Sequence, residues 1–204
     1  MIYVITGHYG SGKTEFAINF AVQKKMHTIV DLDIVNPYFR TADVKDKLDV
    51  KVIAPQFANT NVDIPALPPE INAVFQQEDD VLFDVGGDDD GAIALGRYNK
   101  KFLEKKYKML FVVNTRRPGS QNVKQIVGMV KSVEAASRLK VNGLVNNTHI
   151  MEETMSWHIT EGLEIIKEAA DVLGIPVVYN SGMVEQLPEP AFYMKKYINV
   201  PWEV

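Results

Sequence analysis

The chain has 204 residues, which at about 150 residues per domain predicts one compact domain over residues 1–204. Apolar residues make up 46% and charged residues 24%, a balance typical of a globular protein that buries a core. The formal net charge of −4 argues against nucleic-acid binding, and the absence of cysteine excludes disulfides, thiolate metal sites and a cysteine nucleophile.

The N-terminus does not resemble a secretion signal. Met1 leads directly into the short apolar run 2–6, with no basic segment before it. No stretch approaches the roughly 18 uncharged apolar residues that a membrane-spanning helix needs. The sequence therefore predicts a cytoplasmic protein without a membrane span.

Short apolar or β-branched runs recur along the chain, mostly separated by stretches long enough for a helix. The runs are Ile2–Ile5, Thr28–Val30, Val52–Ala54, Val81–Val85, Met109–Val113, Gly143–Val145 and Pro176–Tyr179. This alternation is typical of an α/β domain. Because the runs are apolar throughout, we expect both sheet faces to be covered and the strands to be parallel. The predicted fold is a three-layer α/β fold with a mostly parallel central sheet flanked by helices.

Apolar residues also recur at helical spacing between the expected strands. They are Phe16, Ala17, Phe20 and Ala21; Val123, Ile126, Val127 and Val130; and Leu163, Ile166, Ala170 and Leu173, the last set ending at Gly174 and Pro176. We further expect one helix over Gly91–Tyr107 and a packed terminal helix over 192–197. The proline-rich segment Pro55–Pro69 is interpreted as an ordered loop at the sheet edge, with a lid as the alternative.

Residues 7–14 read GHYGSGKT and match the pattern G-x-x-x-x-G-K-[ST] in full. The pattern follows an expected strand and precedes an amphipathic helix, as a phosphate-binding loop requires. Glycines let successive backbone N–H groups point at phosphate oxygens, and the helix N-terminus adds partial positive charge. The expected phosphate cradle consists of Gly7, Tyr9, Gly10, Ser11, Gly12, Lys13, Thr14 and Glu15.

Two positions of this motif have specific expected roles. Lys13 is expected to bridge the β- and γ-phosphates, and the Thr14 hydroxyl to ligate a Mg²⁺ ion that joins the same phosphates. The motif alone predicts phosphate binding, so the reaction class must come from its neighbours.

Acidic residues end the second and fourth expected strands. Asp31 and Asp33 should lie on the same side of the chain, at the carboxyl edge where open α/β sheets bind ligands. Asp84 ends an apolar run and opens D-x-x-G, which resembles a Walker B carboxylate that leads into a γ-phosphate sensor. This resemblance implies that Asp84 holds Mg²⁺ through water, and Gly87, which has no Cβ, could bring its N–H close to the γ-phosphate. The three aspartates that follow, Asp88–Asp90, are interpreted as an acidic solvated loop that starts the next helix, or as a partner or cation surface whose position changes with the γ-phosphate.

In order and spacing, these three motifs resemble the SIMIBI class of P-loop NTPases, and the MinD, ParA and CobQ/CobB branch in particular. The resemblance implies that Asp33 polarises the attacking water or supports the magnesium shell, which makes Lys13 and Asp33 the catalytic residues and Thr14, Asp33 and Asp84 the metal site. It also implies a nucleotide-dependent homodimer.

The sequence departs from this branch in two respects. The signature lysine that reaches the partner's nucleotide is replaced by His8, which we interpret as a solvent-facing residue or a weaker, pH-dependent contact. Metal-carrying relatives use cysteine pairs, which are absent here, and the four histidines have no metal-ligand spacing.

The base is expected to be adenine, because the guanine-reading pattern N-K-x-D is absent and the sixth expected strand ends in Asn146 and Asn147. The resemblance favours Asn147 as the reader of the base. Asn146 as the reader, or either residue as a helix cap, remains an alternative. Met183 and Gln186 are weaker candidates for the base site. Arg116 and Arg117 are expected either to bind phosphate or an acidic substrate, or to form a solvated pair at the surface.

The favoured hypothesis is a Mg²⁺- and ATP-dependent switch that hydrolyses ATP slowly and acts on a protein client. The alternative is a small-molecule kinase or an ATP-dependent ligase that phosphorylates an unidentified acceptor. A switch hydrolyses ATP without an acceptor, whereas a kinase or ligase requires one.

Overall fold

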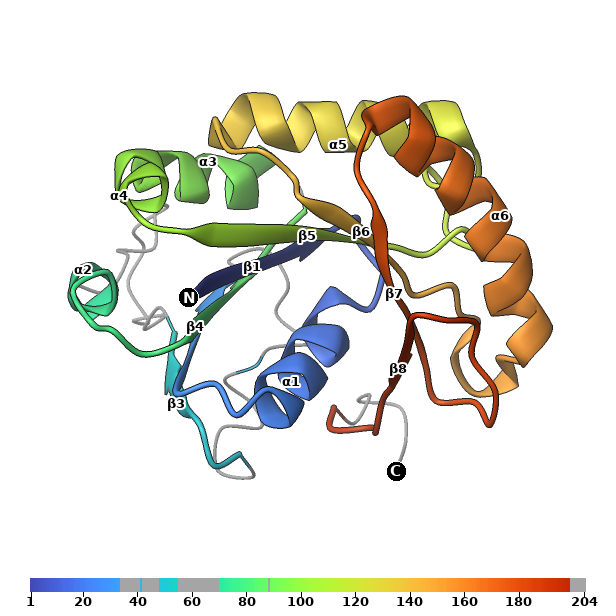
Figure 1. Cartoon of the computed structure of the whole chain (residues 1–204), viewed down its shortest axis with the longest axis horizontal. Coiled ribbons are helices and arrows are strands. Elements are labelled where there is room, and N and C mark those ends of the chain that lie inside the picture. The colour runs from blue at the N-terminus through green and yellow to red at the C-terminus, as the bar shows by residue number, and fades with distance from the viewer. Residues whose placement is uncertain (34–40, 42–47, 55–69, 88, 199–204) are drawn as a thin grey trace, which may run out of the picture.

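The computed structural model describes residues 1–33, 41, 48–54, 70–87 and 89–198. Within them, one sheet of eight parallel strands has the order β3-β2-β4-β1-β5-β6-β7-β8 (Figure 1). The strands are β1 (Ile2–Gly7), β2 (Thr28–Leu32), β3 (Lys51–Ile53), β4 (Val81–Val85), β5 (Tyr107–Val113), β6 (Gly143–Asn146), β7 (Val177–Gly182) and β8 (Ala191–Tyr193).

Helices cover both faces of this sheet and complete three layers (Figure 1). They are α1 (Lys13–Gln23), α2 (Glu70–Val74), α3 (Asp89–Arg97), α4 (Asn99–Glu104), α5 (Val123–Ser137) and α6 (Ser156–Leu173), with a 3-10 helix at Met151–Glu153. One buried cluster joins one sheet face to α2 through α6, and a second joins the other face to α1 and β8. The α/β fold with a parallel sheet between helical layers is therefore confirmed.

Successive residues of each central strand contribute to opposite clusters. Val4, Val30 and Phe83 belong to the cluster with α5, whereas their neighbours Ile5 and Ile29 belong to the cluster with α1. Both sheet faces are thus buried, which explains why the strands read as continuous apolar runs.

All seven expected strands and the expected α1, α5 and α6 are present. The terminal helix expected over 192–197 is wrong, because residues 191–193 instead form the edge strand β8, with Phe192 buried against α1. The single helix expected over Gly91–Tyr107 is also wrong: it divides at Tyr98 into α3 and α4, and Tyr107 begins β5. At this break, the ring of Tyr98 stacks on the ring of Phe75, which follows α2. The expected loop or lid at Pro55–Pro69 lies outside the described residues.

The strand order places the phosphate loop at the point where the chain reverses direction across the sheet. The chain runs from β1 to β2 and back to β4 on one side of β1, and then crosses to β5 on the other side. Ligands of open α/β sheets bind at the carboxyl ends of the strands at such a point. Within the described residues, no helix has the length and apolar character needed to cross a membrane.

Two glycines on the helices provide a matched test of this backbone. Gly174 caps α6 with φ +68°, whereas Gly128 lies inside α5, and a Cβ added to either meets no atom within 4 Å. Gly174→Ala should lower the free energy of unfolding by about 1 kcal/mol, because an L residue is strained in the left-handed region. Gly128→Ala should raise it by roughly 0.5–1 kcal/mol, because alanine loses less entropy in a helix. Urea unfolding measures both changes in the free energy of unfolding. If the two substitutions changed it in the same direction, the assigned end of α6 or the assigned interior of α5 would be contradicted.

Candidate functional site

The loop between β1 and α1 has the curled backbone that phosphate binding requires. Gly10 and Gly12 adopt φ +74° and +77°, which an L residue would take up only with strain. The Ser11 N–H donates to the His8 carbonyl at 3.0 Å, and the Phe16 N–H donates to Gly12 at 3.0 Å. The loop therefore leads into the first turn of α1, where free N–H groups and the helix dipole attract an anion.

The side chain of Lys13 is buried and forms an ion pair with Asp33. Its Nζ lies 2.8 Å from Asp33 Oδ2, and both side chains are under 10% exposed. The backbone N–H of Asp33 donates to Asp31 Oδ1 at 3.1 Å, which fixes the turn after β2. The structure thus brings together the expected phosphate-binding lysine and the expected catalytic acid.

Asp84 lies beside this pair on β4. It is opposite Asp31 of β2 on one side and Ile5 of β1 on the other, and it is fully buried. Oδ2 of Asp84 accepts a hydrogen bond from the Thr41 hydroxyl at 3.1 Å. Oδ1 is buried without a hydrogen-bond partner in the described part of the chain. A buried carboxylate oxygen without a donor suits a cation or its bound water.

Burial is the main reason that the pKa of Asp84 is raised to about 7, and the neighbouring charges of Asp31 and then Asp33 contribute to the same rise. Lys13 and the Thr41 hydrogen bond oppose this rise. Near neutral pH the carboxyl group is therefore divided between its protonated and ionised forms. A divalent cation nearby would favour the ionised form.

The described residues fit the expected magnesium site in donor chemistry. Thr14 is buried in the first turn of α1, and the carboxylates of Asp33 and Asp84 lie near Lys13. Across the ranges that the structure describes, no three His, Cys, Asp or Glu side chains form a metal cage. Magnesium at nucleotide sites uses only one or two protein carboxylates besides phosphate and water, so the expected site does not require such a cage.

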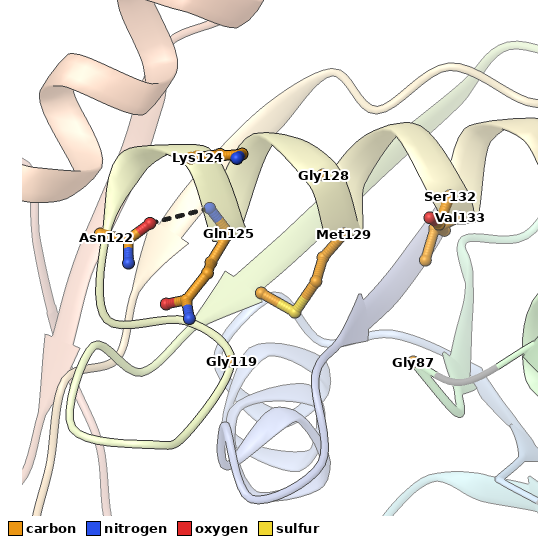
Figure 2. Close-up of a pocket in the computed structure, with 9 residues that line it drawn as sticks. All are labelled: Gly87, Gly119, Asn122, Lys124, Gln125, Gly128, Met129, Ser132 and Val133. Atoms are coloured by element: carbon orange, nitrogen blue, oxygen red, sulfur yellow. Dashed lines mark hydrogen bonds between the residues drawn. The ribbon is translucent and has the colours of Figure 1, made fainter.

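Gly87 packs directly against the start of the phosphate loop. A Cβ on Gly87 would overlap the carbonyl oxygen of Gly7 and lie 3.0 Å from the His8 nitrogen, so only glycine fits. Beyond Gly87 is an open groove of about 640 Å³ (Figure 2). Its lining residues are Gly87, Gly119, Asn122, Lys124, Gln125, Gly128, Met129, Ser132 and Val133. In Figure 2, Gln125 and Met129 extend from α5 on the side where Gly119 lies, and Gln125 points toward Gly119.

The side chain of Asn147 connects the phosphate loop to β7. Its Nδ2 donates to the Ser11 carbonyl at 2.8 Å, and its Oδ1 accepts from the Ser181 hydroxyl at 3.0 Å. The amide of Asn146 is fully used inside the protein: it donates to Ile159 and Asn180 and accepts from Thr148. Neither asparagine caps α6, whose N-cap is Met155, so the capping alternative is wrong.

The two arginines after β5 have different surroundings. Arg117 Nε donates to the Gly10 carbonyl at 3.2 Å and so supports the phosphate loop from outside. Arg116 forms an ion pair with Glu161, and its guanidinium lies 5.5 Å from the ring centre of Trp157. Tyr9, at the tip of the loop, is 69% exposed.

Several residues at the site had no assigned role in the sequence interpretation. Thr41 bonds Asp84, and Asn114 donates to the His149 carbonyl at 3.0 Å while accepting from the His149 N–H. Burial and then the charge of Arg117 lower the pKa of His149 to about 4, so its ring is neutral at pH 7. His149 follows directly on Asn147 and Thr148, but only the folded chain shows that its ring packs against Gly12.

Comparison with known proteins gives a structural answer only. No family model matches the chain, and no curated protein matches it. The cell division protein FtsY of Thermotoga maritima superposes with a TM-score of 0.55 and 19% identity, over 87% of this chain and 60% of that chain.

Two structures of the signal recognition particle receptor FtsY from Elizabethkingia anophelis, one in complex with GDP, have TM-scores of 0.48. They are 18% and 17% identical over 86% and 87% of this chain, and over 55% and 57% of theirs. This chain therefore spans less than two thirds of the length of each of these three structures.

At these identities the likeness shows the fold alone. The superposition with the Thermotoga protein supports the three-layer α/β fold with its parallel sheet. It does not extend to the MinD, ParA and CobQ branch or to the nucleotide.

The raised pKa of Asp84 makes the stability of the nucleotide-free protein depend on pH. The carboxyl group ionises near 3.8 in the unfolded chain and near 7 in the folded one, so the folded state binds more protons in between. The free energy of unfolding should therefore fall as the pH rises from about 4 to about 7. In Asp84→Asn this titration is removed, and the melting temperature should fall less between pH 5 and pH 8. If the melting temperatures of the two proteins changed with pH in the same way, the pH dependence could not be assigned to the Asp84 carboxyl group.

Proposed function

We propose that the protein is a Mg²⁺-dependent nucleoside triphosphatase that acts as a nucleotide-gated switch of the MinD, ParA and CobQ type, with ATP as its nucleotide. The observation that carries this proposal is the buried ion pair between Lys13 and Asp33 inside a complete phosphate-binding motif. A buried ammonium group needs an anionic partner, and Asp33 is that partner in the free protein.

Triphosphate offers Lys13 a second set of anionic oxygens. When Lys13 bonds phosphate, Asp33 becomes available to accept a proton from water or to support the magnesium shell. A bound Mg²⁺ ion would supply charge neutralisation between the β- and γ-phosphates, with Thr14, Asp33 and Asp84 as the residues that hold it. The exchange of partners at Lys13 couples phosphate binding to the turn after β2.

The backbone of the phosphate loop is braced from three directions. Asn147 holds the Ser11 carbonyl, Arg117 holds the Gly10 carbonyl, and Gly87 packs on Gly7. These contacts use carbonyl groups and a glycine surface of the loop and none of its N–H groups, although the Ser11 N–H is already bonded to the His8 carbonyl. The geometry thus supports the expected cradle of Gly7, Tyr9, Gly10, Ser11, Gly12, Lys13, Thr14 and Glu15, with Gly87 near the γ-phosphate.

The adenine preference rests on the sequence, which lacks N-K-x-D and has Asn147 directly after β6. The GDP seen in one FtsY structure belongs to that protein. ATP and GTP therefore need a direct comparison. A nucleotide-dependent homodimer and a protein client are proposed from the resemblance, with His8 in place of the signature lysine.

A kinase or ligase is the second candidate function, and the groove beside Gly87 favours it. The groove is of the size that small-molecule sites have, and it adjoins the proposed γ-phosphate position. Its described lining contains neutral polar side chains, Lys124 and the thioether of Met129, which suit a polar acceptor.

Phosphate release from the purified protein with Mg·ATP or Mg·GTP, and no acceptor, tests the switch. We expect slow, ATP-selective release. Asp33→Asn should reduce the rate by about 100-fold or more while nucleotide binding is retained, because the variant loses the general base but keeps Lys13. Unchanged turnover in the variant would remove Asp33 from the chemistry. Binding without release in the wild type would favour the kinase or ligase.

A further inference from the structure

The face of α1 behind the phosphate loop carries three polar residues at four-residue spacing, Glu15, Asn19 and Gln23. Spacing of this kind places the side chains in one line along the helix. Asn19 is only 1% exposed, so its amide must bond within the protein. The proposed phosphate chemistry uses none of these three side chains.

Each of the three side chains bonds the main chain of the C-terminal segment. Gln23 Nε2 donates to the Tyr193 carbonyl at 2.8 Å. Asn19 donates to the Lys195 carbonyl at 2.8 Å and accepts from the Lys195 N–H at 2.7 Å. Glu15 then accepts from two further backbone groups, the N–H of Tyr197 at 2.6 Å and that of Ile198 at 3.1 Å.

The spacing of these bonds matches an extended chain. Four residues of helix advance about 6 Å, and two residues of strand advance about 6.6 Å. Helix positions 15, 19 and 23 therefore align with alternate chain positions 197, 195 and 193. Asn19 presents both a donor and an acceptor to Lys195, as a neighbouring strand would.

Apolar contacts anchor both ends of the segment. Phe192 packs on Phe16, with ring centres 5.0 Å apart, and Ile198 is buried against Ile18. Lys196 also forms an ion pair with Glu152 in the 3-10 helix after β6, with Nζ 3.7 Å from Oε1. The segment therefore connects α1 to the loop that follows Asn147.

We propose that residues 193–198 form a C-terminal strap that positions the first turn of α1 for nucleotide, and that strap docking and nucleotide binding strengthen each other. Glu15, which holds the end of the strap, directly follows Thr14 at the proposed phosphate site. The inference rests on the proposed function for its ligand. Because coupling between two sites is reciprocal, nucleotide holds the strap down to the same extent that the strap raises nucleotide affinity.

Hydrogen exchange at the strap amides, with and without a non-hydrolysable Mg·ATP analogue, tests the coupling. The amides of Lys195, Tyr197 and Ile198 should exchange about fivefold or more slowly when nucleotide is bound, a factor at the lower end of ordinary coupling. Asn19→Ala should weaken binding of the analogue by a similar factor. Gln23→Ala removes only the outermost bond, remains informative if Asn19→Ala does not fold, and should show a smaller loss in the same direction.

Asn142→Ala is the matched control, because Asn142 also accepts a backbone N–H, that of Met109, but directly precedes β6, at the opposite end of that strand from Asn147. It should leave both the nucleotide affinity and the nucleotide-dependent strap exchange unchanged. If hydrogen exchange at the strap amides were equally fast with and without bound nucleotide, the strap proposal would be overturned and the proposed function would remain intact. A wild-type protein that binds no nucleotide in a separate calorimetric titration would overturn both.

Discussion

Burying charged groups at the carboxyl end of the sheet is the constraint on which the rest of the site depends. Asp33 and Asp84 are almost completely buried together with Lys13. Such groups are costly to remove from water unless they neutralise each other, gain hydrogen bonds or take up a proton. The structure uses all three means: the ion pair of Lys13, the hydroxyl of Thr41 and the raised pKa of Asp84.

This arrangement of buried charges is suited to binding an anionic ligand together with a cation. The free protein satisfies Lys13 with Asp33 and leaves Oδ1 of Asp84 without a partner in the described residues. A triphosphate with its cation would bring anionic oxygens to Lys13 and positive charge to Asp84. The proposed switch therefore follows from a centre whose internal pairing changes when that ligand arrives.

The sequence predicted the parts of the molecule that depend on local patterns. The strands were predictable because burial on both sides makes them apolar throughout, and the phosphate loop because its curl requires glycine at Gly10 and Gly12. Bringing Asp33 and Asp84 to one edge followed from parallel strands alone. The break at Tyr98 and the short strand β8 depend on contacts with Phe75 and Phe16, which are distant in sequence. No local pattern signals them.

The same reason explains what was missed near the site. The bond from Thr41 to Asp84 and the bonds from Asn19 to Lys195 join residues 43 and 176 positions apart. Asn147 was noticed as a candidate reader of the base, but its bond to the Ser11 carbonyl appears only in the folded chain. Side chains that support a backbone carry no motif, because their role depends on the geometry of their partner.

The most direct test of the account is a count of protons released when a Mg·ATP analogue binds, measured by calorimetry in buffers of different ionisation enthalpy. If the cation takes the place of the proton on Asp84, binding at pH 6 should release close to one proton per chain, and less at pH 8. Asp84→Asn should release none beyond the contribution of the nucleotide itself. Tight binding with equal proton release in both proteins would contradict the claim that the buried carboxyl centre is the cation site.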